Sequence, residues 1–170
     1  MQRGVHFMLD ADQAAAFDAA SGDDDRLVEL VEALEETLEE ALEQEATSFC
    51  ESDKAWDPIS CALAPSGPDR DPQDWPWTGV VLGQRSLQAD DDELLVSLLD
   101  PASVAEVSEA LDTLDEETFA EAYAQMPAEL RNPEYSDDEC AYAWEYLSDL
   151  IAFFGQARSA GAHVLFHVGH

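Results

Sequence analysis

The clearest regularity in the chain is an apolar stripe in its first third, with glutamate at most of the positions between. Its members recur at steps of three and four residues and are Leu27, Leu30, Val31, Leu34, Leu38 and Leu42. This spacing predicts an amphipathic helix that opens at residues 23–25, three aspartates that suit the positive end of the helix dipole. Glutamates four residues apart repel one another by roughly 0.2–0.5 kcal/mol per pair. We therefore expect this helix to depend on a packing partner or on salt.

Short apolar runs predict the strands. Gly4–Leu9 and His163–Val168 are compact apolar segments near the two ends of the chain, and residues 79–83 and 93–99 are similar runs in its middle. The two middle runs are expected to form neighbouring strands joined through residues 84–92. A sheet that includes the terminal strands follows from this pattern.

Capping signals predict further helices between these runs. Asp10 precedes a helix that ends near residues 21–22, and Asp115 opens another that ends at a proline. Two Asp-Pro pairs, 57–58 and 100–101, each place a capping side chain before a proline that suits the first turn. Ser136 and Glu139 have the spacing of a capping box and open a long aromatic helix that ends at Gly161.

The segment that precedes the apolar run at residues 79–83 differs in composition. Residues 65–78 contain Pro65, Gly67, Pro68, Pro72 and Pro76 beside two tryptophans, which predicts a long irregular surface loop. Together the elements predict a single α/β domain over residues 1–170: a small mixed sheet that includes the terminal strands, with helices packed on it. At this length such a domain buries roughly 70% of the surface that the unfolded chain exposes.

Charge narrows the range of partners. The chain has 7 Lys and Arg against 39 Asp and Glu, a formal net charge of −32, while 46% of its residues are hydrophobic, which is too many for a disordered acidic tail. Nucleic acids and anionic membranes need cationic side chains to bind, so both are excluded as partners. A basic protein is the partner that this charge favours, and solvation in a salt-rich environment is the alternative.

Cysteine usage and hydropathy indicate the compartment. The three cysteines, Cys50, Cys61 and Cys140, show no paired spacing, which favours a reducing cytoplasm. The N-terminal apolar run meets Asp10 too early for a signal peptide, and no segment has the ~20 apolar residues of a membrane span. We expect a soluble cytoplasmic protein; its oligomeric state stays open.

The only lysine of the chain lies in a distinctive local setting. Lys54 lies between Asp53 and Asp57, with Trp56 two residues after it. On a structural interpretation Lys54 is ion-paired to carboxylates, Trp56 packs under the next helix and Asp57 caps that helix. On a functional interpretation the same residues, with His6 as a further candidate, line a cleft that Trp56 floors and that binds a small polar ligand.

Metal and cofactor chemistry have weak support. His6, His163, His167 and His170 lie on or beside the terminal strands, and adjacency of those strands would bring His6 to the face shared by His163 and His167. No HxH, HExxH or Cys-His spacing accompanies them, and no Gly-rich phosphate loop or GxSxG elbow is present. We therefore expect no metal and no cofactor, and we assign no catalytic residue. Whether the protein is an enzyme stays open.

Several blocks in the same order resemble the YfbM-like family of bacterial proteins. They are Gly-Val-His-Phe at 4–7, Ser-Asp-Lys-Ala-Trp-Asp-Pro-Ile at 52–59, Val-Leu-Gly-Gln-Arg at 81–85, the helix start at 101, and the aromatic positions 142, 144 and 146 followed by the closing strand. The resemblance implies a single α/β domain of unknown function and supplies no catalytic residues. Ser60 stands where other members carry a histidine.

Two classes of function follow. The first is an acidic protein-binding or inhibitory module, such as an antidote to a basic toxin, that acts by charge-complementary occlusion. The second is a small-molecule-binding protein or enzyme with a cleft at Lys54 and Trp56. A third interpretation assigns the charge to salt adaptation alone, which acids spread over all faces would favour and one concentrated patch would not.

Overall fold

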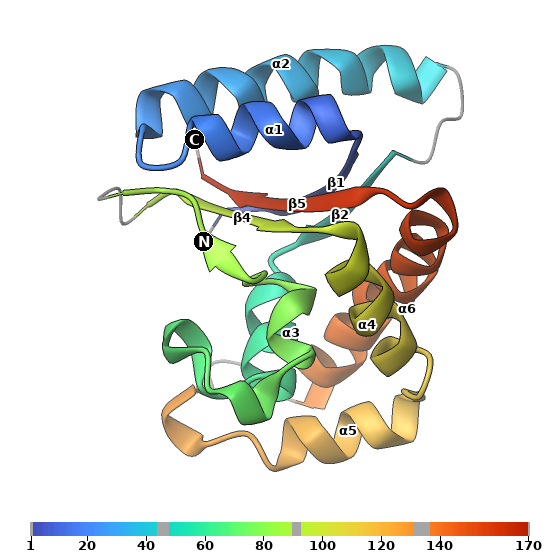
Figure 1. The fold of residues 1–170 in the computed structure, drawn as a ribbon. Coiled ribbons are helices and arrows are strands. Elements are labelled where there is room, and N and C mark those ends of the chain that lie inside the picture. Colours follow the sequence, from blue (N-terminus) through green and yellow to red (C-terminus); the bar gives the residue numbers. More distant parts are fainter. Residues whose placement is uncertain (1, 44–47, 90–92, 131–136, 170) are drawn as a thin grey trace.

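The computed structural model describes residues 2–43, 48–89, 93–130 and 137–169 (Figure 1). Five strands form one sheet in the order β2-β1-β5-β4-β3, and every pairing is antiparallel. Their bounds are β1 Gly4–Leu9, β2 Phe49–Asp53, β3 Arg85–Ser86, β4 Leu95–Leu99 and β5 His163–Val168.

The two terminal strands are neighbours at the centre of the sheet. β1 pairs with β5 along its whole length, with His6 opposite Phe166, and β4 pairs with the other edge of β5. The predicted α/β domain, with terminal strands inside a small sheet and helices packed on it, is confirmed. The sheet is antiparallel throughout and not mixed, because no helix crosses over between two parallel strands in the described residues.

Helices cover both faces of the sheet. α1 and α2 lie on one face, and α3, α4 and α6 lie on the other, with α5 packed beyond α3 and α6 at the far end of the molecule (Figure 1). The bounds are α1 Ala11–Ala19, α2 Asp24–Glu43, α3 Trp56–Leu63, α4 Pro101–Leu111, α5 Glu116–Ala124 and α6 Asp137–Ala160.

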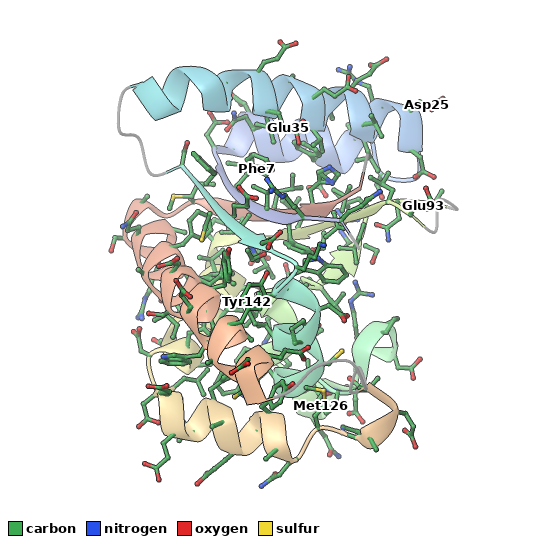
Figure 2. All side chains as sticks on the ribbon, turned by 180° about the vertical axis from the view of Figure 1, so that it is seen from behind. Phe7, Asp25, Glu35, Glu93, Met126 and Tyr142 are labelled. Atoms are coloured by element: carbon green, nitrogen blue, oxygen red, sulfur yellow. The ribbon has the colours of Figure 1, made fainter. Side chains whose placement is uncertain are left out.

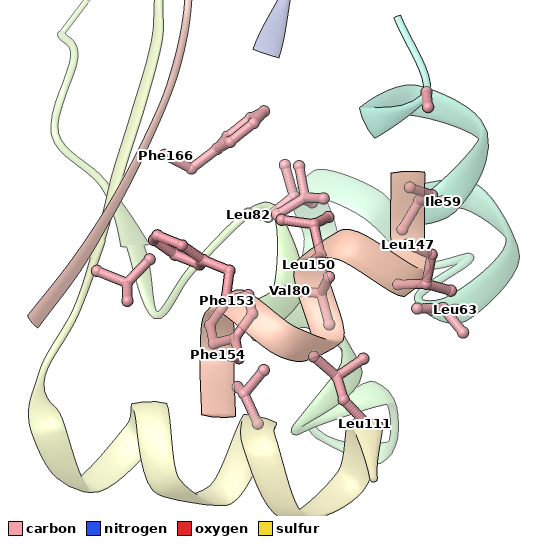
Figure 3. Close-up of a cluster of buried hydrophobic side chains, with 14 of the residues drawn as sticks. Ile59, Leu63, Val80, Leu82, Leu111, Leu147, Leu150, Phe153, Phe154 and Phe166 are labelled. Atoms are coloured by element: carbon pink, nitrogen blue, oxygen red, sulfur yellow. The ribbon is translucent and has the colours of Figure 1, made fainter. Parts of the chain in front are cut away.

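Each face has its own hydrophobic core. Phe7, Phe17 and Leu27 belong to the core between the sheet and the α1–α2 layer. The larger core contains Leu147 and Phe154 of α6, packed against β5, α3 and α4 (Figure 3). Alternation along the strands explains the division, since successive side chains of β1 point to opposite faces.

Three of the predicted N-caps are confirmed. The carboxylates of Asp10, Asp100 and Asp115 accept hydrogen bonds from the backbone N–H groups three residues on. Gly161 follows the end of α6 with φ +62°, a left-handed conformation that suits glycine. Ser136 lies outside the described residues.

Three local expectations were wrong. Residues 79–83 form no strand: Trp77–Val80 is a 3₁₀ turn, and Val80 and Val81 are buried in the core beside α3 and α4. β2 was not predicted at all, because a short edge strand of sequence Phe-Cys-Glu-Ser-Asp lacks a clear alternation. α3 begins at Trp56 with Ala55 at the cap, so Asp57 lies inside the first turn and is not the N-cap.

The loop over residues 65–78 follows its prediction more closely. It contains the short 3₁₀ turns Gly67–Asp69 and Pro72–Asp74 and no longer element. Arg70, in the left-handed region with φ 48°, donates from Nη2 to the Leu82 carbonyl and to Ser86 Oγ, both at 2.8 Å. The guanidinium therefore fastens this loop to the start of β3.

Candidate functional site

The chain turns sharply where β2 passes into α3. Asp53 adopts a left-handed backbone conformation with φ 46°, which is uncommon for a residue other than glycine. Its Oδ2 accepts a hydrogen bond of 2.6 Å from the Tyr142 hydroxyl, and its Oδ1 lies 3.6 Å from Nε of Arg3. Figure 2 shows Tyr142 of α6 beside this turn. The Asp53 carboxylate thus joins β2, α6 and the N-terminal segment.

Trp56 packs against the first and last strands. Its indole Nε1–H donates to the Gln2 carbonyl at 3.0 Å, and its ring centroid lies 5.9 Å from that of Phe166. Gly4 permits this approach, since a Cβ there would lie 2.8 Å from Trp56 Cδ1 and 2.8 Å from Phe166 Cε2. The half-buried indole therefore fixes the start of α3 on the sheet, as the structural interpretation expects.

Lys54 is placed differently from the other residues of this block. Its side chain is exposed, and it forms no ion pair with any residue that the structure describes. The ion pair expected on the structural interpretation is thus absent from the described part of the chain. As far as the described residues go, the Lys54 ammonium is therefore open to a ligand or water.

Asp57 faces a second cluster, between α3, α5 and α6. Its Oδ1 lies 3.8 Å from the Cys61 thiol, which donates to it, and burial raises the pKa of the Asp57 carboxyl. Glu139 of α6 is 9% exposed, and its Oε1 accepts a hydrogen bond of 2.8 Å from the Tyr123 hydroxyl. Its Oε2 has no hydrogen-bond partner among the described residues.

The charge of Asp57 disfavours ionisation of its neighbours in this cluster. Burial, first, and the charge of Asp57, second, raise the pKa of Glu139. Burial and the same Asp57 charge raise the pKa of Cys61 to about 12, so the thiol is protonated and a poor nucleophile at neutral pH. The cluster is an acidic contact between helices, and its cysteine lacks the features of an activated nucleophile.

At neutral pH the free energy of unfolding of the Glu139→Gln variant is expected to exceed that of the wild type by about 1 kcal/mol. The amide keeps an acceptor for Tyr123, removes a buried charge and supplies N–H donors where Oε2 is unpaired. Urea unfolding at pH 7 and pH 4 measures this. Because the Glu139 pKa is raised in the folded state, its carboxyl weakens the fold as pH rises, so the gain should shrink at pH 4. An equal gain at both pH values would contradict the prediction.

His6 lies inside the core and not in a cleft. Its side chain has 0% exposure, and the Nε2–H donates to the Val80 carbonyl at 2.6 Å. Nδ1 has no hydrogen-bond partner among the described residues, and burial lowers the pKa of the imidazole to about 4. The centroid of the Phe166 ring lies 4.7 Å from that of the imidazole and 5.9 Å from that of the Trp56 ring.

The histidines do not converge. β1 and β5 are adjacent as expected, and His6, which is paired with Phe166, faces the core beneath α6. His167 is the residue after Phe166 on β5, so its side chain points to the opposite face of the sheet. The idea that His6 joins His163 and His167 on one face is therefore wrong. In the part of the chain that the structure describes, no three His, Cys, Asp or Glu side chains are grouped to hold a metal ion.

A concave surface lies beside the second half of α6. Two shallow hollows, of about 160 and 650 Å³, adjoin there and share Ala152 and Gln156. We call them together the α6 groove; neither hollow is lined by Lys54 or Trp56. The lining residues are Met8, Phe49, Cys50, Asp149, Ala152, Phe153, Gly155, Gln156, Ser159 and Ala160.

Sequence reasoning missed this groove because one wall is the unpredicted strand β2. The small residues Ala152, Gly155 and Ser159, spaced three and four apart on a helix with an otherwise aromatic character, were the available signal. Of the five expected site residues, the structure places Asp53, Lys54 and Trp56 around one turn. Asp57 faces the Glu139 cluster, and His6 is enclosed.

Among the described residues, no helix is long and apolar enough to cross a lipid bilayer.

Comparisons with known proteins agree on one family. A family model described as a domain of unknown function, DUF1877, matches residues 3–167. The solved structure described as "a Protein of Unknown Function YfbM from Escherichia coli" is 18% identical, with a TM-score of 0.62, covering 98% of this chain and 99% of that one. Similarity at this identity establishes the fold alone. No curated protein matched the sequence.

Proposed function

Because the chain belongs to the DUF1877 family of domains of unknown function, which supplies no chemistry, we propose its function from the charge of its surface. The YfbM-like resemblance points to the same family. The proposed function is that of an acidic protein-binding module for a cationic partner. The supporting observation is that four of the arginines are paired with the protein's own carboxylates. These pairs are Arg3 with Glu51, Arg26 with Glu29, Arg85 with Asp18 and Arg158 with Glu109.

Internal pairing offsets four of the seven cationic side chains, and the formal net charge of −32 leaves acids in large excess. On the outer side of α2, Glu32, Glu35 and Glu36 are exposed, and the Glu35 pKa is raised by burial and by the neighbouring Glu32. Asp25 and Glu35 lie along this helix in Figure 2. Like charges at such spacing destabilise a helix, and a cationic partner would relieve that repulsion. Occlusion of a basic enzyme, as by an antidote to a toxin, is the form of binding that this surface suits.

Exposed acids also occur at the opposite end of the molecule. Glu116, Glu117 and Glu121 of α5 are exposed there, far from α2 in Figure 1. This spread supports the alternative in which the charge serves solvation in salt and no partner exists. The two interpretations differ in whether the position of the acids matters or only their number.

A matched pair of triple variants tests the proposal. Glu32, Glu35 and Glu36 of α2 are changed to Gln in one protein, and Glu116, Glu117 and Glu121 of α5 in the other, so that each has three fewer charges. Anisotropy of labelled polylysine, measured from about 0.05 to about 0.5 M salt, reports binding. At about 0.5 kcal/mol per exposed charge, the α2 variant is expected to bind about tenfold more weakly.

The α5 variant is the control for net charge. It should bind polylysine within about twofold of the wild type if α2 is the contact surface. Equal losses in both variants would favour salt adaptation, and no binding by the wild-type protein at low salt would overturn the proposal. Circular dichroism of both variants ensures that only folded proteins are compared.

A second candidate is a small anionic or polar ligand at the turn between β2 and α3. It is favoured by the exposed Lys54 ammonium, next to Asp53 and Trp56 and unpaired among the described residues. It has less support, because Trp56 is engaged by Gln2 and Phe166, Asp57 faces away and His6 is enclosed. A reaction at this turn has no assigned catalytic group.

A further inference from the structure

The α6 groove combines an apolar lining with an acidic end. Met8, Phe49 and Phe153 supply the apolar walls, and Ala152 and Gly155 leave the α6 side shallow. Its volume, about 160 Å³ in the narrower hollow, suits one or two large apolar side chains. A surface of this kind is depleted of charge at its centre and polar at its rim, as protein interfaces are.

Gly155 is not required by the packing of its own chain. A Cβ built at this position meets no described atom within 4 Å, whereas those at Gly4 and Gly79 meet atoms at under 3 Å. Alanine in a helix interior is favoured over glycine by about 1 kcal/mol. Gly155 therefore leaves this side of α6 open to contacts from outside, and Ala152 and Ser159 continue the small-residue surface one turn in each direction.

The acidic side chains near the α6 groove indicate what kind of molecule binds in it. Asp149 and Cys50 both line the groove. Burial and, to a smaller extent, the nearby charges of Asp149 and Glu51 raise the pKa of the Cys50 thiol to about 12. A second copy of the chain would bring a further net charge of −32 to an already acidic rim. A cationic segment is attracted to the same rim, and small residues at helical spacing favour close approach of another helix.

We propose that the α6 groove binds an amphipathic, cationic helix of the partner, whose apolar side chains enter between β2 and the second half of α6. This inference rests on the proposed function and adds where and how the partner docks. The acids of α2 would contribute attraction over a distance, and the groove would contribute the buried apolar contact that distinguishes one basic protein from another.

Two labelled probes separate these contributions: a synthetic amphipathic helix of leucine and lysine, and polylysine of equal charge without an apolar face. We expect the wild-type protein to bind the amphipathic probe about tenfold more tightly than polylysine. Gly155→Trp and Ala152→Trp fill the groove and should remove this tenfold preference while leaving polylysine binding within about twofold. Ala120→Trp, on the exposed face of α5, is the matched control and should keep the preference.

Ala152 is exposed, so its variant retains a test even where Gly155→Trp fails to fold. The inference is overturned if the folded groove variants keep the preference, or if the wild type shows none. Polylysine binding that depends on α2, in a wild-type protein that shows no preference for the amphipathic probe, overturns this inference and leaves the proposed function intact. Failure of the wild-type protein to bind either probe overturns both. Sedimentation that shows a dimer dissociated by Ala152→Trp would assign the groove to a second copy and also overturn it.

Discussion

Replacing Trp56 by alanine is expected to lower the free energy of unfolding by about 3 kcal/mol, the lower end of the range for large aromatic side chains because the indole is half-buried. The variant loses the contact with Phe166 and the hydrogen bond to the Gln2 carbonyl, and it leaves space beside Gly4. Urea unfolding followed by circular dichroism measures this.

Lys54→Ala is the matched comparison, two residues away. Its side chain is exposed and makes no ion pair with a described residue, so stability should change by less than about 0.5 kcal/mol. A loss above about 1 kcal/mol would mean that Lys54 is structural and would contradict the prediction. If the folded Lys54 variant alone loses a small anionic ligand, the second candidate function gains support over the binding module.

The stability of the protein is expected to fall by about 3 kcal/mol between pH 6.5 and pH 4 through His6 alone. Burial lowers the pKa of this imidazole to about 4 from an ordinary value of 6.5. The unfolded state therefore binds a proton over this range that the folded state does not, so the free energy of unfolding decreases as pH falls. From about pH 8 upward the imidazole is neutral in both states and the effect vanishes.

His6→Leu isolates this contribution from the titration of the many carboxyls. At pH 8 the variant should be less stable than the wild type by about 1–2 kcal/mol, because the Val80 carbonyl loses its donor. As pH falls toward 4.5 that deficit should disappear and then reverse, since leucine does not bind a proton. His163→Leu, at a half-buried position, is the control. A constant difference between wild type and His6→Leu from pH 8 to pH 4.5 would show that His6 does not titrate as described.

Local sequence signals predicted the helices of this protein better than its strands. Asp10, Asp100 and Asp115 each accept a hydrogen bond from a backbone N–H in the first turn of the helix that follows. This capping interaction is local, so it does not depend on tertiary contacts. The strand prediction failed for residues 79–83 because an apolar run of that length signals burial without specifying a strand. β2 was missed since its pairing with β1, and not its own sequence, makes it a strand.

The candidate site shows a similar division. Proximity in sequence correctly placed Asp53, Lys54 and Trp56 around one turn, but it gave no direction for each side chain. The earlier start of α3 turns Asp57 toward Cys61 and Glu139. The contact of Asp53 with Tyr142 spans 89 positions, and no spacing rule anticipates a pair so distant.

The central position of β5 has a consequence for synthesis of the protein on the ribosome. The strand that separates β1 from β4 consists of residues 163–168, so the two halves of the sheet have no common partner until those residues leave the exit tunnel. Until then the apolar edges of β1 and β4 are unpaired, a state in which nascent chains recruit chaperones. Vectorial synthesis therefore favours folding of this domain late, in one cooperative step.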